Sequence, residues 1–398
     1  MDFSPQQQTA LEAVERWIAD PQQQVFRLFG YAGTGKTSIS KYLVEDVGNV
    51  HFAAYTGKAA LVLRSKGCSP ASTIHSLIYL PKEKSAARLR HLEREADEEE
   101  DADRKRELRR LADRERENLR QPAFTLNLES IVTDLRLLVL DEVSMVDEQM
   151  AGHLMSFRTP ILALGDPAQL PPVKGTGWFT DAEPDVMLTE IHRQAEGNPI
   201  IELATTIRQG TLPVHGTYGD SCVIHPGQTD PEELARFDQV LVGLNQTRHK
   251  VNRAIRTVRG FTDHMPEPGD KLVCKRNDKE TGLLNGSQWL VLGRQDIDED
   301  QMILSIQAYD AEEPYAFDVI AWRHPFEDRW DELEHYRIRD AQRFEFGYGL
   351  TVHSAQGSQW DNVCVIDEAG RFPWDAKAKR QWRYTAITRA AQRVTLIR

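Results

Sequence analysis

Residues 30–37 read GYAGTGKT and match the phosphate-loop pattern G-x-x-x-x-G-K-[ST] at every fixed position. The apolar segment 25–29 before this loop is typical of a strand, and residues 38–44 after it are typical of a helix. In such a turn the glycines let successive backbone N–H groups point inward, and the helix adds its N-terminal partial positive charge. The sequence therefore predicts an α/β fold with a binding site for a nucleoside triphosphate.

Two residues of this loop carry chemistry of their own. Lys36 is suited to neutralise the β and γ phosphates, and Thr37 to offer its hydroxyl to Mg²⁺. The other loop residues expected to contact ATP are Gly30, Ala32, Gly33, Thr34 and Gly35. The alternative, a glycine turn that only joins a strand to a helix, is disfavoured because all fixed positions occur in the required strand, loop, helix order.

Two carboxylates follow another expected strand. Residues 136–140 are apolar and end in Asp141 and Glu142. At the carboxyl edge of a parallel sheet, beside a phosphate loop, such residues are suited to hold Mg²⁺ and to activate water. A further strand at 161–164 leads into GDPAQLPP, where Gln169 is positioned to sense the γ-phosphate. The sequence thus predicts hydrolysis of the bound nucleotide.

Composition limits the class of protein. The chain has 398 residues, of which 40% are hydrophobic and 28% charged, as in a soluble protein of two or three domains. No apolar run has membrane-spanning length and no N-terminal signal segment is visible, so we expect no membrane contact and a cytoplasmic location. The four cysteines lack C-x-x-C spacing, which supports neither a disulfide framework nor a zinc site. The net charge of −12 argues against coating nucleic acid by bulk charge, but allows a confined basic groove.

Several polar residues near the expected helix starts have two open interpretations. Residues 3–11 begin a helix, with Ser4 as N-cap, in which Gln7 either reads adenine or is part of a solvated helix start. A strand at 49–55 ends just before Thr56 and Lys58, and His75 lies in the segment STIHS. These three residues suit contacts with a nucleic-acid backbone, and a capped loop is the alternative for each.

Residues 82–120 form a segment of different character. It contains 13 acidic and 13 basic residues, no glycine and no proline, which predicts a charged helical arm. A continuous helix would span about 55 Å, whereas a break in the acidic run 97–103 would give a helical hairpin. A solvated structural or partner-binding insertion and a direct contact with substrate are both open for this arm.

The second half of the chain repeats an α/β pattern without a phosphate loop. Strands are expected at 239–244, 363–366 and 394–397, and helices at 200–208 and 379–388. The segment 260–343 between them has short alternating strands at 271–274, 289–292 and 302–304 with an Asn-Gly turn, which predicts a small β-barrel insertion. Its aromatic residues Trp289, Trp322 and Phe326 could stack on bases, but a barrel this small needs them in its core.

Six motifs in order give the chain a specific likeness. They are GYAGTGKT at 30–37, Asp141-Glu142, GDPAQLP at 165–171, IHRQ at 191–194, TVHSAQG at 351–357 and YTAITRA at 384–390. In these motifs the chain resembles superfamily 1 DNA helicases, in particular the RecD branch and its compact phage Dda type. The resemblance covers nearly the whole chain and implies two RecA-like parallel-sheet lobes, with a charged helical insertion in the first and a small SH3-like β-barrel insertion in the second.

The implied division of the chain follows the motifs. Residues 1–180 would form the first lobe, which carries the ATP site and the arm at about 81–121. Residues 181–259 and 344–398 would form the second lobe, and residues 260–343 the SH3-like insertion.

The resemblance also implies roles for individual residues. Gln7 would contact adenine, Thr37 and Asp141 would hold Mg²⁺, and Glu142 would be the general base. Gln169 and Gly357 would sense the γ-phosphate, and Arg193 and Arg389 would act as arginine fingers from the second lobe. The residues expected along the single strand are Thr56, Lys58, His75 and His353.

The implied function is that of an ATP-dependent DNA helicase that moves 5′ to 3′ on single-stranded DNA and opens duplexes. The alternatives are an ATP-driven translocase that remodels RNA or proteins without efficient unwinding, and a nucleotide-dependent binding switch. We expect a monomer that binds single strands and junctions, with a replication or repair partner at residues 82–120 or at the β-rich insertion. The arm lies where relatives carry a small β-hairpin, called the pin, that splits the duplex. Ser354 stands where relatives commonly have a lysine, and Gln359 where many have a glutamate near the ribose. The resemblance therefore defines the contacts with the strand and with the sugar less well than it defines hydrolysis.

Overall fold

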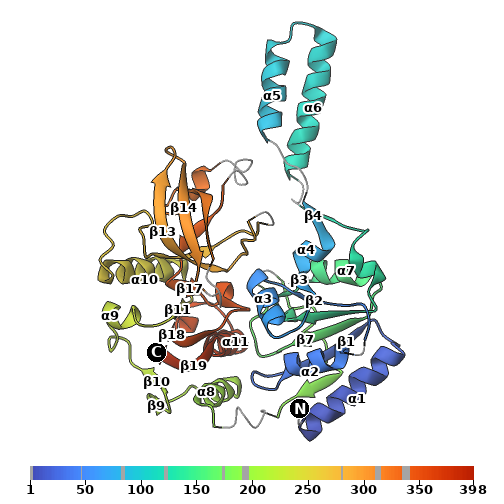
Figure 1. Cartoon of the computed structure of the whole chain (residues 1–398), viewed down its shortest axis with the longest axis vertical. Helices are drawn as coiled ribbons and strands as arrows, with labels where there is room; N and C mark the ends of the chain where they lie inside the picture. Colours follow the sequence, from blue (N-terminus) through green and yellow to red (C-terminus); the bar gives the residue numbers. More distant parts are fainter. Residues whose placement is uncertain are drawn as a thin grey trace.

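The computed structural model of the chain describes residues 3–45, 47–81, 86–120, 124–172, 175–190, 197–278, 281–309, 315–333 and 341–398. Two α/β bodies lie side by side, a helical arm projects from one of them, and a β-rich insertion lies on the other (Figure 1). Among the described helices, none has the length and apolar character needed to cross a membrane.

The first body, which we call the first lobe, is built on a parallel sheet with the strand order β3-β2-β6-β7-β1-β8. Its strands are β1 (Val25–Gly30), β2 (Val50–Ala54), β3 (Ala71–Thr73), β6 (Leu137–Asp141), β7 (Ile161–Gly165) and β8 (Val186–Leu188). The inner strands are mostly apolar, with Arg27 and His51 as polar exceptions, because both faces of a parallel sheet are covered. The expected strands at 25–29, 49–55, 136–140 and 161–164 are confirmed.

Helices pack on both faces of this first sheet. One face is covered by α1 (Pro5–Ala19), α2 (Lys36–Val44) and α3 (Gly57–Ser65), and the other by α4 (Ile74–Ile78) and α7 (Glu148–Ser156). The side chains of β1 alternate between the two cores, with Leu28 in one and Phe29 in the other. The N-terminal helix begins as expected, because the Ser4 side chain caps it and Pro5 occupies its first turn.

The second body, the second lobe, contains a sheet with the order β17-β11-β18-β19-β10-β9. Its strands are β9 (Gly216–Tyr218), β10 (Ser221–Ile224), β11 (Gln239–Val242), β17 (Gly349–Thr351), β18 (Trp360–Ile366) and β19 (Ala390–Ile397). Only the pairing of β9 with β10 is antiparallel among the strand pairs described in this sheet. The helices are α8 (Pro199–Arg208), α9 (Pro231–Leu234), α10 (Asn245–Val258) and α11 (Ala376–Ile387). The two parallel sheets are consistent with two RecA-like lobes.

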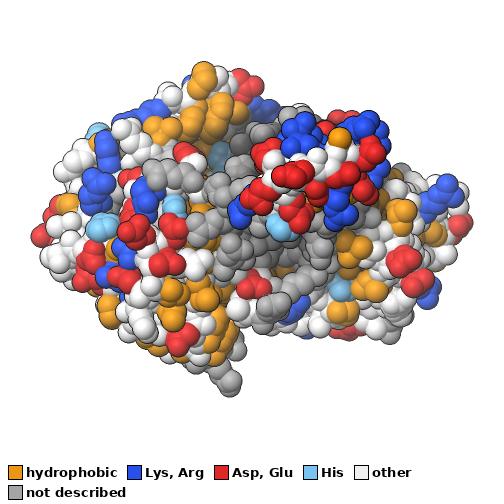
Figure 2. All heavy atoms as spheres, turned by 90° about the horizontal axis from the view of Figure 1, so that it is seen from above, with side chains coloured by type: hydrophobic (Ala, Val, Ile, Leu, Met, Phe, Trp, Pro, Cys, Tyr) orange, Lys and Arg blue, Asp and Glu red, His pale blue; other side chains and the backbone are white. Residues whose placement is uncertain are grey.

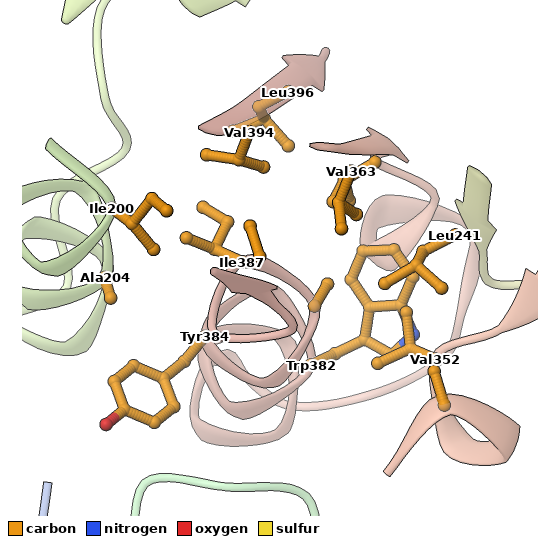
Figure 3. Close-up of a cluster of buried hydrophobic side chains, with 14 of the residues drawn as sticks. Ile200, Ala204, Leu241, Val352, Val363, Trp382, Tyr384, Ile387, Val394 and Leu396 are labelled. Atoms are coloured by element: carbon orange, nitrogen blue, oxygen red, sulfur yellow. The ribbon is translucent and has the colours of Figure 1, made fainter. Parts of the chain in front are cut away.

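Helix α11 anchors the core of the second lobe (Figure 3). Trp382 lies fully buried between the helix and the sheet, beside Leu241 and Val352. The ring of Tyr384 lies at the edge of the same cluster, and its hydroxyl points away from it (Figure 3). The segment YTAITRA is therefore held rigidly by packing, which fixes the polar groups that it presents to the first lobe.

The β-rich insertion is an antiparallel sheet with the order β15-β14-β13-β12-β16. Its strands are β12 (Lys271–Cys274), β13 (Gln288–Asp296), β14 (Gln301–Ala308), β15 (Ala316–Trp322) and β16 (Phe344–Phe346). The two edges of this sheet are joined by a hydrogen bond. The backbone N–H of Trp322, at the end of β15, donates to the carbonyl of Gln342, just before β16, at 2.9 Å. Trp289, Trp322 and Phe326 are 9% exposed or less, so they serve the core and are not available to stack on bases.

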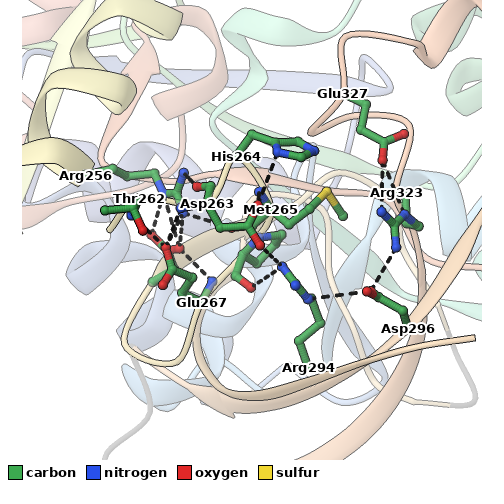
Figure 4. Close-up of polar contacts among 12 residues, drawn as sticks. Arg256, Thr262, Asp263, His264, Met265, Glu267, Arg294, Asp296, Arg323 and Glu327 are labelled. Atoms are coloured by element: carbon green, nitrogen blue, oxygen red, sulfur yellow. Dashed lines mark hydrogen bonds and ion pairs between the residues drawn. The ribbon is translucent and has the colours of Figure 1, made fainter. Parts of the chain in front are cut away.

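A network of ion pairs joins α10 to this insertion (Figure 4). The Arg256 guanidinium is buried and donates to the Asp270 carboxylate at 2.9 Å and to the carbonyl of Asp263 at 2.7 Å. The Asp263 carboxylate in turn accepts from Arg294 at 2.9 Å. Because the charges of Arg256 and Asp270 are buried and paired, removal of either partner is expected to destabilise the joint strongly.

The arm is a helical hairpin of α5 (Ala86–Glu98) and α6 (Ala102–Arg120), which resolves the choice that the sequence left open. The chain turns in the acidic run, where Asp101 Oδ1 accepts from the backbone N–H of Arg104 at 2.9 Å and caps α6. The helices pack through Leu92, Ala96 and Ala112, which are buried. At the base of the arm β4 (Tyr79–Pro81) pairs with β5 (Phe124–Leu126), and acidic and basic side chains mix over the arm seen from above (Figure 2).

Candidate nucleotide and strand sites

A cavity of about 250 Å³ lies at the carboxyl edge of the first sheet, between the two lobes. Residues of both lobes line it. From the first lobe come Ala32, Gly33, Thr34, Gly35, Lys36, Thr37, Ser38, Ala59, Val62, Lys66, Asp141, Glu142, Asp166 and Gln169, and from the second Gly357, Gln359, Thr388 and Arg389. The structure therefore brings together residues that the sequence spreads over more than three hundred positions.

The phosphate loop has the conformation that its glycines were expected to allow. Gly33 and Gly35 adopt φ angles of 82° and 80°, which L side chains rarely adopt. Gly30 is also required, because a Cβ there would lie 2.5 Å from Thr34 Oγ1. Lys36 Nζ donates to the carbonyls of Gly30 at 2.6 Å and Tyr31 at 3.1 Å, so the ammonium group is held over the loop at the start of α2.

Oxygen ligands suited to Mg²⁺ converge beside this loop. Thr37 Oγ1 donates to Asp141 Oδ2 at 3.4 Å, and the neighbouring Glu142 lines the same cavity. Burial and the adjacent Glu142 charge raise the pKa of Asp141 to about 6, while the Lys36 ammonium opposes the rise. Among the described residues no group of three or more His, Cys, Asp or Glu could hold a metal alone. The hydroxyl of Thr37 and the carboxylate of Asp141 are oxygen donors of the kind that Mg²⁺ uses, since it binds through one or two carboxylates together with substrate phosphates.

Glu142 has an unusual backbone conformation. Its φ of 54° lies in the left-handed region, which costs a non-glycine residue energy and persists where the surroundings enforce it. The Glu142 backbone N–H donates to Asp141 Oδ1 at 2.9 Å, so the two carboxylates are linked through the turn. The turn thus places Glu142 at the wall of the cavity.

Gln169, Arg389 and Gly357 approach the cavity from three different segments. Gln169 Oε1 is buried and has no hydrogen-bond partner within the described residues, which fits an acceptor awaiting a ligand. Arg389 is 4% exposed and its Nε donates to the carbonyl of Thr385 at 3.1 Å. A Cβ on Gly357 would lie 2.6 Å from Thr56 Oγ1 of the first lobe, so the lobes meet closely there. The other expected arginine finger, Arg193, lies outside the described residues.

Gln7 does not line the cavity. Its Nε2 donates to the carbonyl of Thr34 at 3.1 Å, and its Oε1 accepts from the Ser4 backbone N–H at 3.0 Å. Gln7 therefore braces the phosphate loop from the start of α1. The amide retains one N–H and one lone pair, so its contact with adenine stays a prediction.

A second cavity, of about 160 Å³, lies where the two lobes meet the β-rich insertion, and we call it the strand groove. Its lining residues are Tyr55, Thr56, Lys58, Met145, Val273, Lys275, Asn285, Gly286, His353, Ser354, Gln356 and Ser358. Three of the four residues expected along the single strand thus lie together. Thr56 and Lys58 belong to the first lobe and His353 to the second.

His75, the fourth residue expected there, is not part of the strand groove. Its ring packs against those of Tyr55 and Tyr79, with centroids 5.6 Å away in each case. Burial lowers the pKa of His75, against the opposing charge of Asp147, so its imidazole is neutral near pH 7. The geometry assigns His75 a packing role beneath Tyr55, and a direct strand contact stays a prediction.

Sequence reasoning did not single out the residues of the insertion that line the strand groove. Lys275, Asn285 and Gly286 follow β12, and the Asn-Gly pair was interpreted only as a turn. Leu284 packs onto the first lobe, since a Cβ on Gly57 would lie 2.7 Å from Leu284 Cβ. In the sequence Lys275 stands ten residues before Asn285, and nothing indicates that this turn reaches the other lobe.

Comparisons with known proteins agree with this geometry. The family described as AAA domain matches residues 2–229, and the family described as UvrD-like helicase C-terminal domain matches residues 346–397. The chain belongs to the AAA domain family, in the superfamily 1 group that includes the RecD, Pif1 and Dda helicases.

Two curated relatives are similar in sequence. The chain is 26% identical over 404 residues to the ATP-dependent RecD2 DNA helicase of Deinococcus radiodurans, which covers 92% of this chain and 46% of the relative. It is 27% identical over 225 residues to the ATP-dependent DNA helicase dda of Enterobacteria phage T4, which covers 52% of this chain and 43% of the relative. The matches thus span less than half of the length of either relative.

Solved structures share the fold. A Pif1 helicase structure described as explaining DNA unwinding at forked duplex DNA has a TM-score of 0.54 at 18% identity, with 99% of this chain and 92% of that chain covered. The Pif1 helicase of Candida albicans has a TM-score of 0.52 at 16% identity, with 100% and 94% covered. At these identities the likeness defines the arrangement of the lobes and the insertion.

Proposed function

We propose that this chain is an ATP-dependent DNA helicase that moves 5′ to 3′ along single-stranded DNA and separates the complementary strand. One observation carries the proposal: a single cavity between the lobes contains the phosphate loop and Glu142 of one lobe and Arg389 of the other. Because the strand groove lies along the same junction, any change in lobe spacing at the nucleotide changes the grip on the strand. The direction rests on the motif resemblance.

The residues of the first lobe prepare the reaction. The loop from Gly30 to Thr37 binds the triphosphate, with Lys36 neutralising the β and γ phosphates as its bonds to the loop carbonyls are exchanged. Thr37 and Asp141 would hold Mg²⁺, which would supply positive charge beside the phosphates. Glu142 accepts a proton from the attacking water, and Gln169 orients that water with its unpartnered oxygen.

The second lobe completes the site when the lobes close. Arg389 donates to the transferring phosphoryl group, Arg193 assists, and Gly357 lets the loop that contains it approach the γ-phosphate. Hydrolysis removes the γ-phosphate, which both lobes contact in the closed state. The closed state is then no longer favoured, and the lobes open. Repeated closing and opening with alternating grip by Thr56, Lys58 and His353 moves the protein along the strand.

We assign three parts to the chain. Residues 1–180 form the first RecA-like lobe with the arm at about 81–121, residues 181–259 and 344–398 form the second, and residues 260–343 form an SH3-like barrel, whose sheet is completed by β16 at the start of the last segment. The barrel is supported by the bond from Trp322 to Gln342 that joins its edge strands. We further propose that the chain works as a monomer on single strands and junctions, in replication or repair. The arm and the insertion are its surfaces for a protein partner.

Strand displacement tests the proposal. Two duplexes of the same sequence, one with a 5′ and one with a 3′ single-stranded tail, are incubated with the protein, ATP and Mg²⁺. Opening of the 5′-tailed duplex alone is the expected result, with the Glu142→Gln variant as inactive control. If neither duplex opens while single-stranded DNA still accelerates ATP hydrolysis, the chain is a translocase. If DNA does not change hydrolysis, it is a binding switch.

A further inference from the structure

The buried hydroxyl of Tyr384 connects the second lobe to two loops of the nucleotide site. Its hydroxyl accepts a hydrogen bond from the Ala32 backbone N–H at 2.8 Å and donates one to Asp166 Oδ2 at 2.7 Å. Ala32 belongs to the phosphate loop, and Asp166 begins the segment that carries Gln169. One atom of the second lobe therefore contacts both loops that must be aligned for hydrolysis.

The roles in these two hydrogen bonds are fixed by chemistry. A backbone N–H can only donate and an ionised carboxylate can only accept, whereas a phenol does both. Asp166 is 1% exposed and Tyr384 is 2% exposed, so water does not replace either partner while the lobes are in contact. When the lobes separate, all three groups become accessible to water. The hydrogen bonds are thus coupled to the contact between the lobes.

Neighbouring contacts on the same face of α11 support this coupling. The Leu170 backbone N–H donates to Thr385 Oγ1 at 2.9 Å, and Gln381 Nε2 donates to the carbonyl of Pro167 at 3.2 Å. Arg389, which lines the nucleotide cavity, follows five residues after Tyr384, just beyond the end of α11. The helix that holds the Tyr384 hydroxyl against the first lobe therefore also sets the position of the arginine.

We propose that Tyr384 is a positioning residue. When the lobes are closed, its hydroxyl holds the phosphate loop and the loop that carries Gln169 in alignment. The inference rests on the proposed function, and it specifies how closure reaches the reacting groups. Closure aligns Ala32 and Asp166 through one hydroxyl and brings Arg389 to the cavity in the same movement. Conversely, a bound phosphate group that shifts either loop moves the second lobe through the same hydroxyl.

A matched control exists within the second lobe and its insertion. The Tyr348 hydroxyl also accepts from a backbone N–H, that of Lys271 at 3.1 Å, and donates to a buried carboxylate, that of Asp270 at 3.0 Å. All three groups lie on the same side of the lobe junction. Tyr348→Phe thus removes an equivalent pair of hydrogen bonds without altering the contact between the lobes.

The experiment compares Tyr384→Phe with Tyr348→Phe in the full chain. The first readout is hydrogen exchange of the Ala32 amide in protein with isotopically labelled alanine, without nucleotide. We expect exchange to accelerate about tenfold in Tyr384→Phe, the factor expected for one lost buried hydrogen bond, and to be unchanged in Tyr348→Phe. The second readout is ATP turnover with single-stranded DNA, where kcat should fall about tenfold in Tyr384→Phe while KM changes much less.

A second variant keeps the test decisive if Tyr384→Phe does not fold. Thr385→Val removes the neighbouring bond from Leu170 without touching the Tyr384 hydroxyl. It should also accelerate Ala32 exchange, because the hydrogen bond from Ala32 depends on the contact between the lobes.

Each outcome has a distinct meaning. Unchanged Ala32 exchange in both lobe-junction variants would overturn the inference, as would an equal loss of kcat in Tyr348→Phe. Accelerated Ala32 exchange in Tyr384→Phe, found together with a wild-type protein that hydrolyses no ATP, would establish the contact and refute the proposed function instead. Accelerated exchange together with lowered kcat in Tyr384→Phe alone would support both.

Discussion

The Lys58 ammonium nitrogen of the first lobe lies 4.8 Å from the centroid of the Trp360 ring of the second lobe. Such a cation–π contact contributes about 0.5–2 kcal/mol, depending on how far the cation is desolvated. Lys58 also lines the strand groove. The lobes are thus in contact on the strand side through Lys58 and Trp360, and on the nucleotide side through Tyr384, Ala32 and Asp166.

Lys58→Ala should weaken binding of single-stranded DNA and reduce its dependence on salt. One lost phosphate contact lowers the slope of log K against log salt by about 0.7 for a single strand. Fluorescence anisotropy of a labelled oligonucleotide at several salt concentrations measures both quantities. Lys41→Ala, an exposed lysine on α2 that does not line the strand groove, should leave the slope unchanged. An unaltered slope in Lys58→Ala would remove this residue from the strand contacts.

Glu142→Gln should retain ATP binding and lose turnover. Loss of a general base typically costs a factor of about 10² to 10⁴, while the amide keeps the size of the side chain. Steady-state ATP hydrolysis and nucleotide binding by fluorescence are the two measurements. Glu148→Gln, an exposed residue at the start of α7, serves as the control. Turnover at the wild-type rate in Glu142→Gln would show that another group activates the water.

Arg389→Ala should lose DNA-stimulated hydrolysis while nucleotide affinity changes little. An arginine finger contributes about 10³ to 10⁵ in kcat because it stabilises charge that develops only in the transition state. The exposed Arg393→Ala on β19 is the matched control. Because Arg389 is buried, thermal unfolding of both variants must be compared as well. A folded Arg389→Ala protein with a normal rate would contradict completion of the site by the second lobe.

The sequence predicted those features that depend on local pattern. The phosphate loop and the strands that end in Gly30 and Asp141 are encoded in contiguous residues, so period and motif suffice for them. What it could not predict are contacts that depend on how the lobes meet. Neither the turn at Asn285, which reaches the strand groove, nor the Tyr384 hydroxyl, which reaches Ala32, has a local signature. The same holds for Gln7, whose helical start was expected but whose bond to Thr34 was not.

Glu345 should make the protein sensitive to acid. Burial alone would raise the pKa of its carboxyl, but Lys275, Arg248 and Arg343 lower that pKa to about 2 from 4.5. A depressed pKa contributes stability above pH 4.5, which is lost as the pH falls towards 2. The shift corresponds to about 3 kcal/mol at neutral pH.

Urea unfolding of Glu345→Gln between pH 2 and 7 tests this expectation. The variant should be less stable than wild type by about 3 kcal/mol at pH 7, and the two proteins should converge near pH 2. The exposed Glu129→Gln should follow the wild-type curve. A constant difference between Glu345→Gln and wild type across this range would mean that the three cations do not act through the Glu345 charge.

Removal of the arm should separate duplex opening from ATP hydrolysis. Pro81 pairs with Phe124 at the base of the arm, so an Asn-Gly turn can replace residues 82–123 and close the ribbon of β4 and β5 as a two-residue hairpin. The described buried residues of the arm, Leu92, Ala96 and Ala112, pack within the hairpin itself, so the shortened protein should fold and keep DNA-stimulated hydrolysis. Strand displacement from the tailed duplex should change if, as the motif resemblance implies, the arm takes the place of the β-hairpin pin. Full-length protein with Leu92→Asn, which breaks the hairpin packing but keeps the arm charges, distinguishes a rigid arm from a charged tether. Loss of hydrolysis in the shortened protein would instead make the arm part of the structural support of the first lobe.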